Sequence, residues 1–176
     1  MLKAFSNRLL QTTTKPGVRF VHIEKRLKEL GYTLPPAPQP KGNYRTCLRT
    51  GNTLYIAGHL PFPPNGGELI CGKVGKEISP EQGYKAAQYV ALNLIATIKE
   101  QVGDLDKVKQ VIRLGGFVNC VDGYTALPGI INGASDLFCE VFGDKGLHAR
   151  LAVGNNALPF NIPVEIEAIV ELTLRR

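Results

Sequence analysis

Apolar residues follow two different spacings along the chain, and each spacing predicts one type of secondary structure. In residues 21–30, 79–102 and 127–142 they recur every three to four positions, which is the spacing of a helix with one buried face. A glycine directly follows each of these stretches, and glycine commonly ends helices. The sequence therefore predicts one short helix near the start and two longer helices.

Alternation of apolar and polar residues predicts strands at 44–49, 53–57 and 108–121, and two more between residues 147 and 174. The tripeptide TGN at 50–52 joins the first two strands and has the composition of a hairpin turn. After the opening helix the order is strand, strand, helix, strand, helix, strand, strand. We predict an α+β fold in which the two long helices cover one face of a mixed β-sheet.

The second helix has the clearest start. Ser79 suits the capping position, Pro80 suits the first turn, and Gln82 can complete a capping box with Ser79. Residues 58–77, which precede this helix, form a long loop rich in glycine and proline. Loops of this length in compact domains are often functional, so we expect this loop to contribute to a site.

The two carboxyl-terminal strands carry charged residues among apolar ones. In the first, His148 and Arg150 alternate with apolar residues, and in the second Glu165, Glu167 and Glu171 do so. Such alternation is usual in a sheet with one wet face, and it also fits a binding site. Because both long helices lie on one face, we expect Arg150 and Glu165 on the other, where a second copy of the chain could cover them.

The overall composition describes an ordinary globular domain. The chain has 176 residues, of which 44% are hydrophobic and 20% charged, enough for one soluble domain with a substantial core. No run approaches the roughly 18 consecutive apolar residues that span a membrane. The four cysteines form no CxxC pair and no metal-ligand spacing, so we expect reduced thiols. We expect no metal, no cofactor and no membrane partner.

The formal net charge of +6 is concentrated at the start of the chain. Residues 1–20 contain four basic residues and no acidic residue, which is typical of a mitochondrial targeting presequence. We therefore expect a mitochondrial (matrix) protein with one domain at 21–176; the alternative is a basic tail on a cytoplasmic protein. The remainder carries only +2, and 7% of residues are aromatic with no tryptophan, so we do not expect nucleic acid as a partner.

Arg150 and Glu165 are the strongest candidates for chemistry. An arginine presents a planar fork of donors that binds a carboxylate at two points. A glutamate can accept a proton or orient a water, so the pair could hold a small anionic substrate beside a hydrolytic water. A structural ion pair at an interface is the alternative. His59 and His148 could act as acid–base groups or serve as ordinary polar side chains. The sequence contains no Ser-His-Asp arrangement, phosphate-binding glycine loop or zinc signature.

Several segments together resemble one known family. They follow in order along most of the chain after residue 20: IEKRLKELGYTLPP, NYRTCLRTGNTLYIAGHLP, GKVGKEISPEQGYKAAQYVALNLIATIKEQVGDLDKV, INGASDLFCEVFG and HARLAVGNNALPFNIPVEIEAIVE. On these segments the chain is identified as a member of the RidA (YjgF) superfamily, also called the liver perchloric-acid-soluble protein family. It most resembles the YjgF/chorismate-mutase-like endoribonuclease branch. The resemblance implies a chorismate-mutase-like α+β domain that forms a homotrimer, with ligand clefts between subunits.

The resemblance also implies an activity and a set of site residues. The family activity is hydrolysis of reactive enamines and imines, such as 2-aminoacrylate, to 2-oxo acids and ammonia. By resemblance, Arg150 holds the substrate carboxylate and Glu165 lies near the attacking water. The same resemblance implies four further substrate-binding positions at the cleft, which are Tyr44, Gly58, His59 and Asn132.

The chain departs from the family pattern at three positions. Ala152 stands where many deaminases have cysteine, Ala57 where they have serine, and His59 where they have glutamine. The leading hypothesis is an enamine/imine deaminase that takes a small-molecule carboxylate or imine as its substrate. The alternatives are a single-strand endoribonuclease and a non-catalytic binder of small carboxylates.

Overall fold

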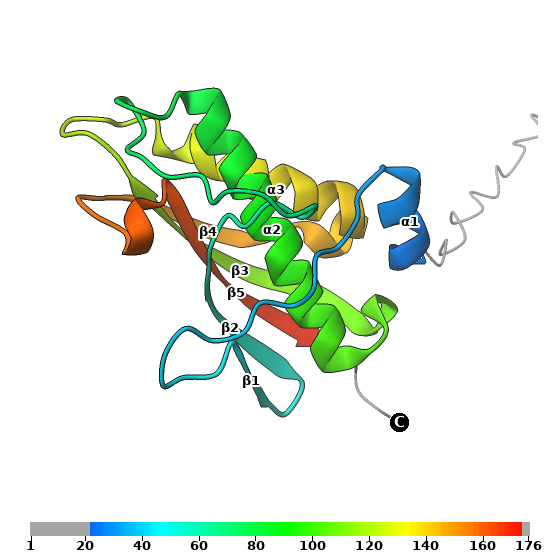
Figure 1. The fold of residues 1–176 in the computed structure, drawn as a ribbon. Helices are drawn as coiled ribbons and strands as arrows, with labels where there is room; N and C mark the ends of the chain where they lie inside the picture. The colour runs from blue at the N-terminus through cyan, green and yellow to red at the C-terminus, as the bar shows by residue number, and fades with distance from the viewer. Residues whose placement is uncertain (1–21, 174–176) are drawn as a thin grey trace, which may run out of the picture.

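The computed structural model describes residues 22–173, whose helices and sheet form two layers (Figure 1). The predicted targeting segment at 1–20 lies outside the described residues. Single turns of 3-10 helix lie at Leu105–Lys107, Gly143–Gly146 and Pro159–Asn161. In chain order the longer elements are α1 (Ile23–Glu29), β1 (Cys47–Thr50), β2 (Thr53–His59), α2 (Pro80–Val102), β3 (Val108–Asn119), α3 (Leu127–Phe142), β4 (Ala149–Asn155) and β5 (Val164–Leu172).

The predicted order of helices and strands is confirmed. The five strands lie in the order β1-β2-β5-β3-β4, so β5 occupies the centre of the sheet. Pairing is antiparallel except between β3 and β4, which are parallel and are connected by α3. A parallel pair requires such a crossover connection. Within the described part of the chain, no helix has both the length and the apolar character needed to cross a membrane.

The start of α2 confirms the predicted capping box. The backbone N–H of Gln82 donates to Ser79 Oγ at 3.2 Å, and the backbone N–H of Ser79 donates to Gln82 Oε1 at 2.8 Å. These two bonds satisfy N–H groups that have no partner inside the helix. A cap of this kind typically stabilises a helix by about 1 kcal/mol.

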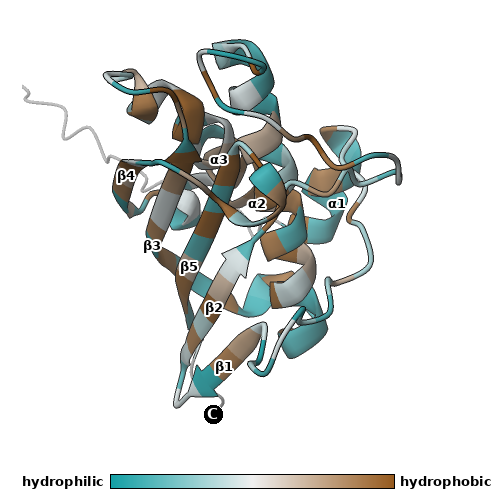
Figure 2. Ribbon diagram, turned by 60° about the vertical axis from the view of Figure 1, so that its left-hand side comes forward, coloured by the Kyte–Doolittle hydropathy of each residue, from teal (hydrophilic) through white to brown (hydrophobic). Residues whose placement is uncertain are grey.

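The core lies between the helices and the side of the sheet that faces them. Hydrophobic and hydrophilic bands alternate along β5 in Figure 2, and every second residue of this strand is buried. Burial of a valine, leucine or isoleucine side chain contributes roughly 1.5–3 kcal/mol to stability. The buried residues of β5 are Val164, Ile166, Ala168, Val170 and Leu172, and those of α3 include Ile130, Ile131, Ala134, Leu137, Phe138 and Val141.

The opposite face of the sheet, which we call the open face, has no helix over it in the described part of the chain (Figure 1). Leu48 on β1 and Tyr55 on β2 lie opposite each other and are 53% and 49% exposed. Leu151 on β4 is also exposed, and the strand register puts it on the same face. Large apolar side chains exposed together on one surface are typical of protein–protein contacts.

Candidate functional site

Arg150 lies on the edge strand β4, and its side chain reaches toward α3. Its Nη1 donates to Asn132 Oδ1 at 2.7 Å and to Ser135 Oγ at 3.0 Å. Asn132 and Ser135 are three residues apart, so both acceptors lie on one face of the helix. Within residues 22–173, Nε and Nη2 of Arg150 form no hydrogen bond. The guanidinium therefore has donors left for a two-point contact with a carboxylate.

Ser135 connects Arg150 to His148. Ser135 Oγ lies 3.0 Å from His148 Nε2, and His148 Nδ1 lies 2.6 Å from the carbonyl oxygen of Gly146. A carbonyl only accepts, so Nδ1 carries the proton and Nε2 accepts from the Ser135 hydroxyl. Burial lowers the pKa of His148, the bond to Gly146 opposes this, and Arg150 lowers it further. The imidazole is therefore neutral at pH 7 and orients Ser135 toward Arg150.

Arg150 and Glu165 lie on opposite faces of the sheet, so the prediction that both lie on the open face is wrong for Arg150. Arg150 lies opposite Leu114 on β3, and Leu114 is buried beneath the helices. Glu165 lies opposite Phe117, three residues further along β3 and hence on the other face. Alternation along β4 distinguishes two faces without showing which one the helices cover. In this strand Leu151 and Val153 face outward, whereas Ala152 packs against the core on the same face as Arg150.

A second group of predicted residues lines a pocket of about 390 Å³, which we call the Glu165 pocket. Tyr44, Gly58 and Glu165 all lie on its wall. The predicted site is thus divided in a single chain, with Arg150 and Asn132 in one part and the Glu165 pocket in the other. The remaining lining residues of the pocket are Lys41, Leu60, Pro159 and Phe160.

The surroundings of Glu165 favour its protonated form. Burial raises the pKa of Glu165 above its ordinary value of 4.5, and the neighbouring Glu167 carboxylate raises it further. A bulge in β2 between Ile56 and His59 brings Gly58 against Glu165. A Cβ on Gly58 would lie 2.1 Å from Glu165 Oε1, so a side chain at position 58 would displace the Glu165 carboxylate. A carboxyl group with a raised pKa suits proton transfer closer to neutral pH.

His59 does not line the Glu165 pocket, in contrast to its predicted role in substrate binding. Its side chain is buried, with Nδ1 at 2.7 Å from the carbonyl oxygen of Ala57 and Nε2 at 2.7 Å from Thr97 Oγ1 on α2. Nδ1 therefore donates and Nε2 accepts from the threonine hydroxyl. These two bonds tie the β2 bulge to α2. His59 thus supports the position of Gly58 from behind, without direct access to a ligand.

The buried His59 predicts a loss of stability in mildly acidic solution. Burial lowers its pKa below the ordinary value of 6.5, against the opposing hydrogen bonds with the backbone of Ala57 and Gly58. The unfolded chain therefore binds the proton more readily. The contribution of His59 to the free energy of unfolding is full above pH 6.5 and falls below it, by up to ~1.4 kcal/mol per pH unit.

The measurement is urea unfolding of wild type and His59→Gln between pH 5 and 8. Glutamine can form both hydrogen bonds without titrating, so the difference between the two proteins cancels contributions from His148 and Glu165. We expect the variant to lose less stability than wild type as the pH falls. If the free energy of unfolding falls equally in the two proteins as the pH is lowered, His59 is not a buried neutral histidine.

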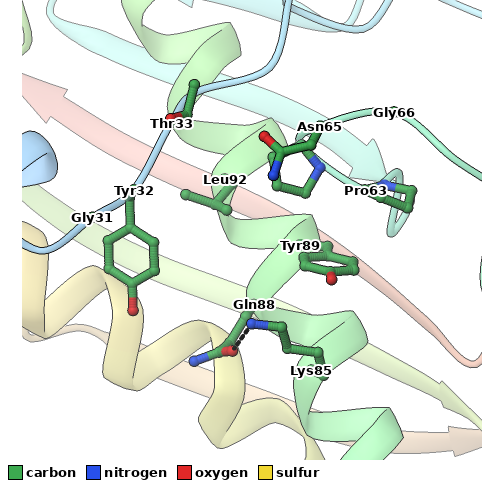
Figure 3. Close-up of a pocket in the computed structure, with 11 residues that line it drawn as sticks. Gly31, Tyr32, Thr33, Pro63, Asn65, Gly66, Lys85, Gln88, Tyr89 and Leu92 are labelled. Carbon is green, nitrogen blue, oxygen red and sulfur yellow. Dashed lines mark hydrogen bonds between the residues drawn. The ribbon is translucent and has the colours of Figure 1, made fainter.

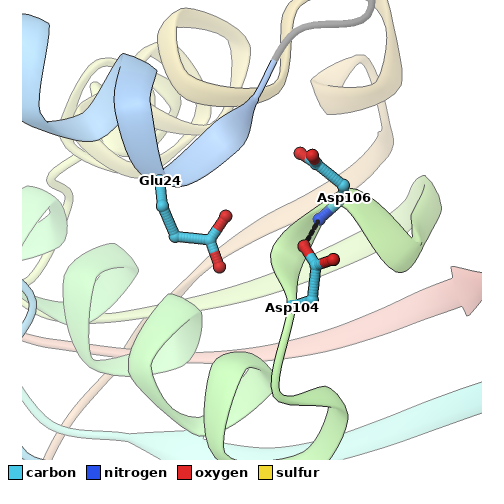
Figure 4. Close-up of side chains that lie close together, drawn as sticks. All are labelled: Glu24, Asp104 and Asp106. Carbon is cyan, nitrogen blue, oxygen red and sulfur yellow. Dashed lines mark hydrogen bonds between the residues drawn. The ribbon is translucent and has the colours of Figure 1, made fainter.

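Three carboxylates gather beside α1, and Figure 4 shows Glu24, Asp104 and Asp106 close together. Each of them already accepts backbone hydrogen bonds. Glu24 Oε1 accepts from Leu105 N at 3.1 Å, and Asp106 Oδ1 accepts from Ile23 N at 2.8 Å. Asp104 Oδ1 accepts from Asp106 N at 2.9 Å. The cluster therefore caps α1 and the 3-10 turn at Leu105–Lys107, and these bonds account for its presence.

A further pocket, of about 310 Å³, lies beside α2 and contains none of the predicted site residues (Figure 3). Several of its polar groups are bound within the fold. Lys85 Nζ donates to Gln88 Oε1 at 3.2 Å and lies 5.2 Å from the centre of the Tyr89 ring. The Tyr32 hydroxyl donates to Glu140 Oε2 at 3.0 Å. The contacts of Lys85 lie within α2, and the bond from Tyr32 connects the segment after α1 to α3.

Comparisons with known proteins identify relatives over most of the chain. The family model described as "YjgF/chorismate_mutase-like, putative endoribonuclease" matches residues 24–172. Protein TCP17 of Trypanosoma cruzi is 40% identical over 151 residues, which are 85% of this chain and 94% of TCP17. A 2-iminobutanoate/2-iminopropanoate deaminase of Dermatophagoides farinae is 29% identical over 136 residues, which are 77% of this chain and 91% of the deaminase.

A solved structure shares the same fold. The crystal structure of Atu1372, a protein of unknown function from Agrobacterium tumefaciens, matches with a TM-score of 0.79 and 44% sequence identity, over 86% of this chain and 94% of that protein. The predicted chorismate-mutase-like α+β fold is thereby confirmed. On its fold and on the family model, the chain belongs to the YjgF/chorismate-mutase-like family.

Proposed function

We propose that this protein hydrolyses reactive enamines and imines of the 2-aminoacrylate type to 2-oxo acids and ammonia, at sites between the subunits of a homotrimer. The observation that carries the proposal is the divided site. Among the described residues, Nε and Nη2 of Arg150 have no partner at one edge of the sheet, and Glu165 has a raised pKa in a pocket on the other face. The similarity to the deaminase of Dermatophagoides farinae supports this choice of reaction.

In an oligomer, Arg150 of one copy of the chain can lie beside the Glu165 pocket of another copy. A contact between the β4–α3 edge of one subunit and the Glu165 pocket of the next joins two different surfaces. Repeated around an axis, such a contact forms a closed ring. The exposed apolar residues of the open face, among them Leu48, Tyr55 and Leu151, would be buried between subunits. The family resemblance favours a ring of three.

The residues on both sides of this interface suit hydrolysis of an imino acid. Nε and Nη2 of Arg150 hold the substrate carboxylate by two hydrogen bonds. 2-Aminoacrylate first gains a proton on its methylene carbon and loses one from nitrogen, which gives 2-iminopropanoate. Water then adds to the imine carbon while Glu165 accepts a proton from it. Glu165 returns this proton to nitrogen, which gives the carbinolamine. The hydroxyl proton of the carbinolamine then passes through Glu165 to the amino group as the C–N bond breaks and the carbonyl forms, and ammonia and the 2-oxo acid leave.

A single-strand endoribonuclease is the second candidate, because the Glu165 pocket presents exposed Tyr44 and Phe160 beside Lys41. Aromatic faces for stacking and nearby cations are the features that bind single-stranded RNA. Incubation of the purified protein with single-stranded RNA tests this candidate directly. Cleavage by wild type that disappears in Glu165→Gln would favour it over the deaminase.

The first test of the proposal is the release of 2-oxo acid from 2-aminoacrylate, generated freshly from serine by a pyridoxal-phosphate dehydratase. We expect wild type to accelerate release above the uncatalysed rate, and light scattering to give the mass of a trimer. Heat-inactivated protein is the control. A protein of trimeric mass that gives no acceleration would contradict the deaminase. Saturable binding of pyruvate by that protein would instead identify a non-catalytic carboxylate binder.

A further inference from the structure

Phe160 combines high exposure with an unusual backbone conformation. Its side chain is 64% exposed, although phenylalanine is normally buried. Its backbone lies in the left-handed region, with φ 54° and ψ 19°, and Asn161 also has a φ of 54°. Asparagine tolerates this region, whereas a bulky residue there is strained. Strain of this kind persists only where surrounding contacts hold it, and such residues concentrate at functional sites.

The contacts that hold the turn come mainly from Asn161, its second residue with left-handed backbone. Its carbonyl oxygen accepts from Gly72 N at 2.7 Å, and its Oδ1 accepts from Asn119 Nδ2 at 3.0 Å. Asn119 is fully buried and also donates to the carbonyl oxygen of Ile162 at 3.2 Å. The turn is thus tied to the end of β3 and to the loop before α2. These bonds fix the backbone that presents the Phe160 ring.

The ring lines the Glu165 pocket. Tyr44, Leu60 and Pro159 provide the other large apolar surfaces of the same pocket, and Glu165 and Lys41 are its charged groups. Its volume of about 390 Å³ falls within the roughly 300–1,000 Å³ that is usual for small-molecule sites. A three-carbon acid beside Glu165 would leave this apolar wall unused. An apolar substituent on the substrate would cover this apolar wall and remove it from water.

We propose that Phe160 determines substrate specificity, and that with Tyr44 and Leu60 it forms a subsite for the side chain of 2-imino acids with large apolar or aromatic substituents. This inference rests on the proposed function, since it assumes that the reacting carbon lies beside Glu165. The left-handed turn holds the ring at the pocket in advance of binding. A rigid apolar wall favours substrates with matching side chains because less ordering is needed on binding.

The test compares imines that an amino-acid oxidase generates from phenylalanine, leucine and alanine. We expect wild type to have the higher kcat/KM for the phenylalanine and leucine imines. Phe160→Ala should lower kcat/KM for these two by roughly 10- to 100-fold, mainly through KM, and should lower kcat/KM for the alanine imine by a much smaller factor. Phe160→Tyr should restore the preference. Phe160→Gly, which suits the left-handed backbone, should show the same loss as Phe160→Ala.

Two results would overturn the inference. One is an equal loss for all three imines. The other is dissociation of the trimer in Phe160→Ala, because Phe160 would then be a subunit contact. Calorimetric binding of phenylpyruvate and pyruvate distinguishes failure of this inference from failure of the proposed function. If wild type shows no turnover, the deaminase is excluded. If Phe160→Ala then binds phenylpyruvate more weakly than wild type does but binds pyruvate equally well, the subsite is retained.

Discussion

Replacement of Arg150 by alanine is expected to lower kcat/KM for the proposed hydrolysis of 2-aminoacrylate by about 100-fold or more, without dissociation of the proposed trimer. Each hydrogen bond to a charged group contributes about 1.5–3 kcal/mol, and Nε and Nη2 offer two such bonds to the substrate carboxylate. Arg150→Lys should recover only part of the loss, because an ammonium group cannot make the two-point contact. Initial rates of 2-oxo acid release measure both variants.

The matched control for Arg150→Ala is Arg49→Ala. Arg49 is an exposed arginine on β1, and its Nε donates to the carbonyl oxygen of Gly51 at 2.9 Å. Arg49→Ala should leave the rate of 2-oxo acid release unchanged. That result would show that the loss in Arg150→Ala is not a general effect of removing a positive charge. If Arg150→Ala has the mass of a trimer and retains the wild-type rate, Arg150 does not bind the substrate carboxylate.

Mixing of two inactive variants tests whether the site is divided between subunits. Arg150→Ala and Glu165→Gln each remove one half of the proposed site. In randomly mixed trimers, about one quarter of the interfaces would pair an intact Arg150 with an intact Glu165. We therefore expect roughly a quarter of the wild-type activity to return after unfolding and refolding the two variants together. Persistent inactivity of the mixture would show that both residues act within one chain.

Gly133→Ala is expected to destabilise the folded protein by about 3 kcal/mol. Gly133 lies on α3 where this helix meets α2, and a Cβ there would lie 2.0 Å from the carbonyl oxygen of Tyr84. That oxygen belongs to the backbone of α2, so the clash cannot be relieved by a change of rotamer. The two helices would have to separate, and core contacts between them would be lost. Thermal unfolding should show a decrease in Tm of roughly 6–12 °C.

Gly129→Ala is the control for this prediction, because Gly129 lies on the same helix and an added Cβ there would meet no other part of residues 22–173 within 4 Å beyond its own helix backbone. Alanine has the higher helix propensity, so this change should stabilise the protein by about 0.5–1 kcal/mol. Opposite signs for the two substitutions would identify the α2–α3 contact as the cause. A small effect at both positions would mean that the helices pack less closely than the structure has them.

The helices and the hairpin could be predicted because their signals are local. The capping box at Ser79 and Gln82, and the turn at 50–52, depend on residues close together in sequence, and the structure has both. The orientation of Arg150 could not be predicted in this way. It depends on the register between β3 and β4, which α3 separates in sequence, and on which face of β4 the helices cover.

The candidate site also could be predicted only in part, because some of its contacts join residues distant in sequence. Tyr44, Gly58 and Glu165 line one pocket, whereas the His59 side chain is turned into the core beside Thr97. The bulge in β2 reverses the side to which His59 points, and simple alternation cannot anticipate a bulge. Ser135 was missed because its contact with Arg150 spans a helix and a strand.

The central position of β5 has a consequence for biosynthesis. β5 follows the other four strands along the chain, and both β2 and β3 pair with it. The β1–β2 hairpin and the β3–β4 pair are therefore synthesised before β5, the strand that joins them in the sheet. Pairing between strands distant in sequence is slow, and unpaired strand edges can associate with other chains. The nascent polypeptide carries the β2 edge once residue 59 has been made and the β3 edge once residue 119 has been made, and both wait for β5.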